Sequence, residues 1–254
     1  MFAIRRWGAV APGLQQPEQW ADWVRKPFVP VGVLDIDVSG IPAMARRRLG
    51  YLAKMAVSVA DQALTGEMNC AEIPVVWASR YGDAQKSLAL LAEHAGNQLL
   101  SPTAFALSVH NGVGSQHSIL RHIQANAVCI AASEALPEVA MLEAIGLLDA
   151  GANQVLLVCY DEALPQAYAQ FQHENRIDAA WAVLLERPQQ GELAYTIQLT
   201  QGKADERSSS LSLEDELQLP HSLEVLYFLL SATPGQMTFQ NQSDGGWRWG
   251  CVRA

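Results

Sequence analysis

The sequence has few cysteines, and none of them forms a motif. Cys70, Cys129, Cys159 and Cys251 are far apart and include no Cys-x-x-Cys pair. Two of them, Cys129 and Cys159, lie in apolar, strand-like runs, where a buried free thiol is the usual state. We therefore expect all four thiols to be structural and reduced, as in a cytoplasmic protein.

Long apolar runs and an excess of positive charge are also missing. No run approaches the roughly 18 apolar residues of a membrane helix, and the N-terminal stretch up to Pro12–Gly13 is typical of a first strand and turn rather than of a signal peptide. The formal net charge of -9 argues against binding to nucleic acid or to an anionic membrane. An acidic protein partner is not excluded, because a small basic patch can exist within a negative total.

The chain has 254 residues, half of them hydrophobic, which suffices for a substantial core. The apolar runs Asn126–Ala131 and Gln154–Cys159 predict strands buried on both faces, as in a parallel sheet covered by helices. A helical pattern separates these two runs, so together they predict a right-handed βαβ unit. Further strands are expected at Phe2–Arg6, Ile73–Ser79, Ala179–Leu185 and Ala194–Leu199.

Helices are indicated by apolar residues that recur every three or four positions. The clearest apolar face runs from Leu52 to Ala63. Other helices are expected at Ala84–His94, at Gln116–Gln124, and from Ser222, as the N-cap, to about Leu230. Two segments are expected to lack regular structure, and these are Gln15–Pro30 and the polar segment Gln201–Gln218.

No repeat or long linker divides the chain, so we expect a single domain over residues 1–254. Its core is expected at 1–186, followed by a divergent extension at 187–254. A terminal antiparallel hairpin is predicted from Gln236–Gln240 and Trp247–Val252, around Ser243–Gly246. The fold class is α/β, with a mostly parallel sheet covered by helices and this hairpin at the end.

A sharp turn, Ala132–Glu134, follows the strand that ends at Ala131. Because proline is tolerated only in the first turn of a helix, Pro137 places residues 133–136 at the cap and first turn of the next helix. There a carboxylate such as Glu134 is favourable by roughly 0.3–1 kcal/mol, so it needs no further function. The same place would lower the pKa of a thiol, but the turn contains no cysteine.

Other chemically suggestive residues have ordinary interpretations. His117 and His122 are five apart, about 140° around a helix, so with His110 they do not predict a metal site. Ser133 lacks the flanking glycines of a nucleophile elbow. The glycines of Asn111–Gly114 lead to no GK[ST] sequence, and we expect them to allow a close backbone approach at an interface. Neither a metal nor a cofactor is expected.

Four segments, in their order along the chain, share the pattern of one known family. They are Ile4–Leu14, Ala45–Ala56, Ser101–Ile119 and Leu147–Asp161. Together they resemble the N-terminal half of the β-ketoacyl synthase (thiolase-like) superfamily. More narrowly, they resemble the chain-length factors of bacterial polyene and type II polyketide systems. The resemblance covers roughly residues 1–185 and implies a thiolase-like half-fold.

The resemblance also implies a lost active site. Counting back from Gly151 without gaps places Glu134 at the catalytic cysteine of the family, and a shift of one residue would place Ser133 there. Chain-length factors similarly lack this cysteine. The C-terminal half of the family, with two histidines that decarboxylate the malonyl group and stabilise the oxyanion, has no counterpart after Glu186, and His221 stands in a Pro-His-Ser context. No catalytic residue is therefore expected.

Phe105, Leu107 and Val109 alternate before Asn111, as in a half-buried strand. In the family this segment lies near the dimer axis, so the resemblance makes these four residues candidates for a substrate tunnel or a partner interface. Bulky side chains there would limit the length of a growing chain. Steric overlap of the growing chain with the tunnel wall is costly, whereas one extra methylene placed in an empty part of the tunnel improves binding by only about 1 kcal/mol.

The leading hypothesis is a non-catalytic subunit like a chain-length factor. It would pair with a β-ketoacyl synthase, meet the acyl carrier protein through that complex, and shape the tunnel for polyketide or polyene elongation. The synthesis of an arylated polyene pigment is the pathway that the resemblance favours. One alternative is a stand-alone acyltransferase or hydrolase that uses Ser133 or Cys129, and another is a purely structural scaffold subunit.

Overall fold

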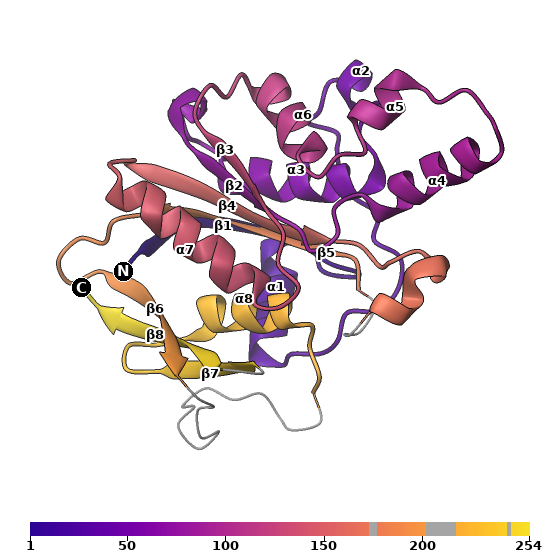
Figure 1. The fold of residues 1–254 in the computed structure, drawn as a ribbon. Coiled ribbons are helices and arrows are strands. Elements are labelled where there is room, and N and C mark those ends of the chain that lie inside the picture. Colours follow the sequence, from indigo (N-terminus) through magenta and orange to yellow (C-terminus); the bar gives the residue numbers. More distant parts are fainter. Residues whose placement is uncertain (173–176, 202–216, 243–244) are drawn as a thin grey trace.

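The computed structural model describes residues 1–172, 177–201, 217–242 and 245–254. Its strands form a five-stranded central sheet and a separate three-stranded sheet (Figure 1). In spatial order the central sheet consists of β1 (Ala3–Val10), β5 (Ala179–Glu186), β4 (Gln154–Asp161), β2 (Val75–Ala78) and β3 (Ala127–Ile130). The smaller sheet consists of β6 (Leu193–Gln201), β8 (Gly245–Arg253) and β7 (Met237–Gln242).

Most strands of the central sheet run in one direction. β2 pairs in parallel with β3 and with β4, whereas β5 is antiparallel to both β4 and β1. β1 therefore points the same way as β4, and β5 alone is reversed. This confirms the expected mostly parallel sheet. The predicted βαβ unit is present as β3, α7 (Leu136–Asp149) and β4, although β2 lies between its two strands.

The helices fall close to their predicted ranges where the apolar spacing is clear. α3 (Tyr51–Ala63) and α4 (Ala84–Ala95) confirm two predicted helices, and α6 (Gly112–Arg121) starts four residues before its expected position. The remaining helices are α1 (Pro17–Arg25), α2 (Ala43–Arg46), η1 (Cys70–Glu72, a 3₁₀ helix), α5 (Pro102–Ala106), η2 (Gln166–Phe171, a 3₁₀ helix) and α8 (His221–Ser231).

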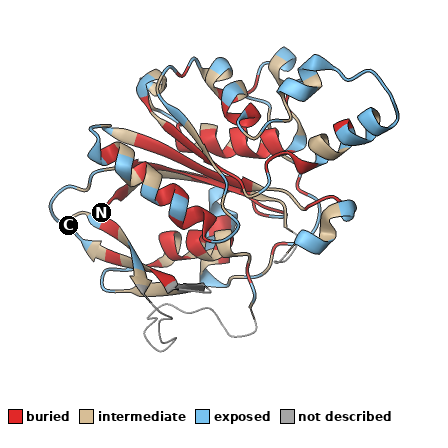
Figure 2. Cartoon of the chain, viewed as in Figure 1, coloured by how far each residue is buried: buried red, intermediate tan, exposed pale blue. Residues whose placement is uncertain are grey.

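Helices cover both faces of the central sheet. α3 packs against β1, β4 and β5 on one face, and α7 packs against β2, β3 and β4 on the other (Figure 1). All of β2 is buried, and β4 is buried except at its two terminal residues (Figure 2). Burial on both faces explains why these strands are apolar almost throughout.

The C-terminal region closes the side of α7 that faces away from the central sheet. α8 packs against α7 and α1, and the three-stranded sheet lies beyond these helices (Figure 1). Tyr195 of β6 and Trp249 of β8 belong to the same hydrophobic core as the buried face of α7. The chain therefore covers with its own C-terminal residues a surface that a half-fold would leave open.

The expected terminal hairpin is confirmed by the antiparallel pair β7 and β8. Residues 243–244 of its turn lie outside the described residues, as do residues 202–216 of the expected polar loop. All four cysteines are free, as expected, and Cys159 and Cys251 are buried. In the parts of the chain that the structure describes, no helix is both long enough and apolar enough to cross a membrane.

Two local expectations were wrong. The segment Gln15–Pro30, expected to be irregular, contains α1, in which Pro17 occupies the first turn and the side chain of Gln19 accepts a hydrogen bond from the Gln16 backbone N–H at 2.9 Å. Trp20 and Trp23, three residues apart, are both buried on one face of this helix. Ser222 is not an N-cap either. α8 begins one residue earlier, and the Ser222 hydroxyl instead accepts a hydrogen bond from the Trp181 indole at 2.7 Å.

Candidate functional site

The turn between β3 and α7 changes direction sharply and leads directly into the helix. Ser133 and Glu134 are exposed, and α7 begins at Leu136 with Pro137 in its first turn. Ala135, which lies between Glu134 and Leu136, has φ 51° and ψ 37°. This left-handed conformation costs a residue with a Cβ about 1–2 kcal/mol. Ala135 is the N-cap, so Ser133 and Glu134 lie before the cap rather than in the cap and first turn predicted for residues 133–136.

Neither Ser133 nor Cys129 has the surroundings of a nucleophile. Within the described residues, no hydrogen bond links the Ser133 hydroxyl to a histidine or a carboxylate. Cys129 is half-buried in β3, and burial raises the pKa of its thiol. Its thiolate fraction at neutral pH is consequently small, and the thiolate is the reactive form.

A buried carboxylate in the first turn of α7 joins this helix to the C-terminal region. Glu138 is fully buried, its Oε2 lies 2.8 Å from Nε2 of His221, and its Oε1 accepts a hydrogen bond from the Trp249 indole at 3.0 Å. The sequence analysis did not single out this group. The available signal was a carboxylate one residue after Pro137 in an otherwise apolar helix.

His221 is held in its charged form by this arrangement. Burial alone would lower the pKa of its imidazole, but the charge and hydrogen bond of Glu138, assisted by Glu224, raise it to about 10. His221 Nδ1 lies 3.7 Å from Glu224 Oε2 on the next turn of α8. A histidine that is a cation at neutral pH is a poor general base.

A small cavity of about 80 Å³ lies between the N-terminal ends of α7 and α8 and the ends of β2 and β4. Asp161 and Glu162 contribute to its lining. Burial, followed by the charges of Asp83 and Asp178, raises the pKa of Glu162 to about 7. Glu162 can thus exchange a proton near neutral pH.

The four tunnel candidates do not form a strand. Ser101 caps a short helix, α5, through a hydrogen bond from Ala104 N–H to its hydroxyl, and a tight turn follows. The apolar alternation of the sequence therefore arises from a helical turn and a bend, which was missed because three residues are too few to separate period 2 from period 3.6.

The structure also separates the tunnel candidates from one another. The side chains of Phe105 and Val109 are exposed to 60% and 43%, and Asn111 is exposed at the start of α6. Leu107 lines a groove of about 370 Å³ between α2, α5 and α6, with Leu49, Ile119 and Leu120. The role of these residues in substrate binding stays a prediction.

The glycines before and within α6 serve packing inside the chain. A Cβ on Gly114 would lie 2.8 Å from the Trp77 ring, and a Cβ on Gly112 would lie 2.9 Å from the Leu107 carbonyl oxygen. The close backbone approach expected at these glycines is thus made within this chain. Of the histidines, His110 Nε2 lies 2.7 Å from the Ser79 carbonyl oxygen, and no group suited to a metal occurs in the described residues.

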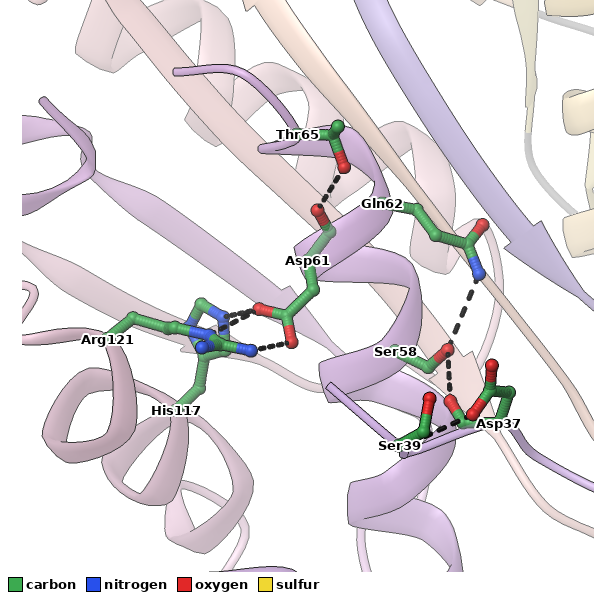
Figure 3. Close-up of polar contacts among 8 residues, drawn as sticks. All are labelled: Asp37, Ser39, Ser58, Asp61, Gln62, Thr65, His117 and Arg121. Atoms are coloured by element: carbon green, nitrogen blue, oxygen red, sulfur yellow. Dashed lines mark hydrogen bonds and ion pairs between the residues drawn. The ribbon is translucent and has the colours of Figure 1, made fainter. Parts of the chain in front are cut away.

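A second polar cluster anchors α6 to α3 (Figure 3). Asp61 of α3 accepts two hydrogen bonds from the Arg121 guanidinium, at 2.8 and 2.5 Å, and its Oδ1 lies 3.4 Å from Nε2 of the buried His117. Burial alone would raise the pKa of Asp61, but the hydrogen bonds from His117 and Arg121 hold it below its ordinary value. Asp61 therefore fixes the C-terminal half of α6, which leads directly into β3.

A family profile described as "Beta-ketoacyl synthase, N-terminal domain" matches residues 20–250. The matched range begins in α1, includes the turn before α7 and extends into β8. The chain therefore belongs to the β-ketoacyl synthase family. No curated protein matches the chain.

Two solved structures match almost the whole chain. A chain from the complex of the ketosynthase ApeO with its chain length factor ApeC, from Xenorhabdus doucetiae, is 26% identical with a TM-score of 0.78, over 98% of both chains. A chain of the ishigamide ketosynthase/chain length factor is 13% identical with a TM-score of 0.73, over 99% of both chains. A β-ketoacyl synthase from Burkholderia phymatum STM815 is 13% identical with a TM-score of 0.59, over 73% of this chain and 59% of its own. The family and the thiolase-like fold expected from the sequence are confirmed.

We expect Glu138→Gln to lower the free energy of unfolding by about 3–5 kcal/mol at neutral pH, because it removes the carboxylate that lies closest to the buried His221 cation. The folded pKa of His221 is raised from 6.5 to about 10. Its contribution to stability is therefore complete below the lower value and is lost as the pH rises through the higher one. Urea denaturation at a series of pH values should show the difference from wild type shrinking towards pH 10.

Glu143→Gln is the matched control for this experiment, because Glu143 lies on the same helix without a hydrogen bond or ion pair in the described residues. We expect this control to change stability by less than about 0.5 kcal/mol. A Glu138→Gln variant as stable as the control at neutral pH would contradict the structural role of the pair.

We expect Asp61→Asn to loosen α6, because it removes the carboxylate that holds Arg121 and faces His117. The groups are partly exposed, so the loss of stability should be modest, about 1–2 kcal/mol. Hydrogen exchange should accelerate in α6 more than elsewhere. Because the folded pKa of Asp61 is lowered from 3.8, its contribution is present at neutral pH, and the two proteins should converge in stability as the solution is acidified below that value.

The matched control is Asp22→Asn, which breaks an exposed pair with Arg25 at 2.8 Å on α1. An exposed pair of this kind contributes little, so we expect no measurable change. Equal effects of the two substitutions on hydrogen exchange in α6 would contradict the anchoring role of Asp61.

Proposed function

We propose that this chain is a non-catalytic subunit resembling a chain-length factor. It pairs with a complete β-ketoacyl synthase and forms part of the wall of the tunnel in which a carrier-protein-bound polyketide or polyene chain is elongated. The observation that carries the proposal is the turn before α7, residues 131–135, which has the sequence Ala-Ala-Ser-Glu-Ala and contains no thiol. A family member without this nucleophile needs a partner to perform the condensation.

The chain has support for this role from one solved complex. It matches 98% of a chain that comes from a complex of a ketosynthase with its chain length factor. By contrast, it matches only 62% of a chain in the complex AntDE:AntF, a type II carrier protein with its ketosynthase, and 59% of the Burkholderia synthase.

The two edges of the central sheet differ in a way that favours a partner at β3. At the β1 edge, the Ala9 backbone N–H donates to the Gln62 side chain at 3.2 Å, and the Ala9 carbonyl oxygen accepts from the Trp20 indole at 3.0 Å. These side chains block pairing of another strand with β1 at this point. At the β3 edge, no side chain of the described residues bonds to the backbone in this way, and the strand is only half-buried.

Apolar side chains are exposed on the helices next to β3. On α6, which leads into β3, the Ile119 side chain is 77% exposed. On α7, which packs against β3, Val139 and Leu142 are exposed. A sheet edge with free N–H and C=O groups is a template for another strand, and exposed apolar side chains beside it supply the burial that a stable interface needs.

The remaining parts of the proposal concern the substrate. Leu107 is the tunnel candidate that lines a groove, and the carrier protein would meet this chain through the complex rather than directly. An arylated polyene is the product class that we favour. A purely structural scaffold is the second candidate, because Phe105 and Val109 are exposed and line none of the described cavities.

We expect Ile119→Asp to weaken the complex with the partner β-ketoacyl synthase by roughly 30-fold, because it places a charge in an apolar interface. The dissociation constant can be measured by titration calorimetry with the purified subunits. Leu199→Asp is the matched control, since Leu199 is 68% exposed on β6 in the separate three-stranded sheet. Equal affinities of the two variants, or a wild-type chain that never binds a synthase, would rule out the proposed interface.

We expect the isolated chain to remain unmodified when it is incubated with acyl-carrier protein, because Ser133 has no base and the pKa of the Cys129 thiol is raised. Intact-protein mass spectrometry measures this directly. In the complex, Ser133→Ala and Cys129→Ala should leave the product yield unchanged. An acyl adduct that disappears in either variant would favour the stand-alone acyltransferase instead.

A further inference from the structure

Leu107 is held from one side by a lysine on α4. Nζ of Lys86 donates a hydrogen bond to the Leu107 carbonyl oxygen at 3.3 Å and lies 2.5 Å from Oδ2 of Asp83. Asp83 also caps α4, because its Oδ1 accepts the Lys86 backbone N–H at 2.9 Å. The Asp83 carboxylate thus orients the Lys86 ammonium group towards the Leu107 carbonyl oxygen.

The same carbonyl is approached from α6 by a glycine. Gly112 donates its N–H to the Val109 carbonyl at 2.8 Å, which closes the turn between α5 and α6. A Cβ at Gly112 would lie 2.9 Å from the Leu107 carbonyl oxygen, closer than side chains normally come. The Leu107 backbone therefore lies between Lys86 and a residue that has to be glycine, and its place is fixed by both.

Fixing the backbone also fixes a wall of the groove. Leu107 contributes one side of the groove, whereas Leu49 and Ile119 contribute others from the α2 end and from α6. Phe105 and Val109, which flank Leu107 in the sequence, are exposed and do not line this groove. A shift of the Leu107 backbone would therefore move this side of the groove, while the same residues would still line it.

We propose that Lys86 is a positioning residue for length selection, which acts by holding the Leu107 backbone against Gly112 so that the groove keeps one fixed depth. The proposal rests on the proposed function, since it assumes that the groove forms part of the elongation tunnel. If the Leu107 side of the groove is rigid, an acyl chain that is one unit too long overlaps with it and is excluded. If the Leu107 backbone can move, the longer chain fits. Lys86 touches no substrate and acts only through Leu107.

The test uses Lys86→Met, which keeps the length of the side chain but cannot donate a hydrogen bond. Lys86→Arg restores a donor, and Lys54→Met is the matched control, because Lys54 lies on α3 with no side-chain hydrogen bond in the described residues. Each variant is measured in complex with the synthase for affinity and for the distribution of product lengths. Hydrogen exchange over residues 105–112 is measured on the isolated chain.

For Lys86→Met we expect exchange over residues 105–112 to be roughly tenfold faster, as for the loss of a hydrogen bond to a charged group. The affinity for the synthase should stay within about twofold of wild type. The Lys86→Met complex should make products of more than one chain length. Lys86→Arg should restore a narrow distribution of product lengths, and Lys54→Met should give the wild-type distribution.

A Lys86→Met complex that makes the wild-type product distribution overturns the proposal, even if exchange is faster, because the contact would then be merely structural. If the wild-type chain forms no complex or yields no product, the proposed function fails instead. Hydrogen exchange on the isolated chain then still tests whether Lys86 holds the Leu107 backbone. Unchanged exchange over residues 105–112 in Lys86→Met would show that it does not.

Discussion

One buried carboxylate, that of Glu138, joins the turn-bearing helix α7 to the C-terminal region. It contacts His221 at the start of α8 and Trp249 of β8. A carboxylate and an imidazolium are stable away from water only while they stay paired. The geometry of the turn before α7 consequently depends on the docking of residues that lie more than 80 positions later in the chain.

The turn without a thiol and the open edge of the sheet both support the proposed role. The turn still directs the chain into the positive end of α7, but Ser133 and Glu134 stand there without a base or a thiol. Within the described residues, no side chain bonds to the backbone at the β3 edge beside it, whereas Gln62 and Trp20 do so at the β1 edge. The proposed role uses both features, because the partner would supply the nucleophile and could pair at this edge.

The sequence predicted those parts of the structure that depend on periodicity. The apolar run of β4 indicated a strand buried on both faces, and the spacing from Leu52 to Ala63 indicated α3. The same prediction was wrong for β3, which lies at the edge of the sheet and is only half-buried. Prolines concealed α1, because Pro17 starts this helix rather than breaking it. The pairs Glu138–His221 and Asp61–Arg121 could not be predicted, since their members are 83 and 60 residues apart and meet only after the helices pack.

The C-terminal covering of α7 has a consequence for how a complex would assemble. Because α8 and the small sheet seal that side, the chain can complete its hydrophobic core before it encounters another subunit. Assembly is then the docking of two folded bodies, whose rate is set by diffusion and orientation rather than by folding. Subunits that dock as folded bodies can also dissociate intact, so the proposed complex could exchange one subunit without unfolding either.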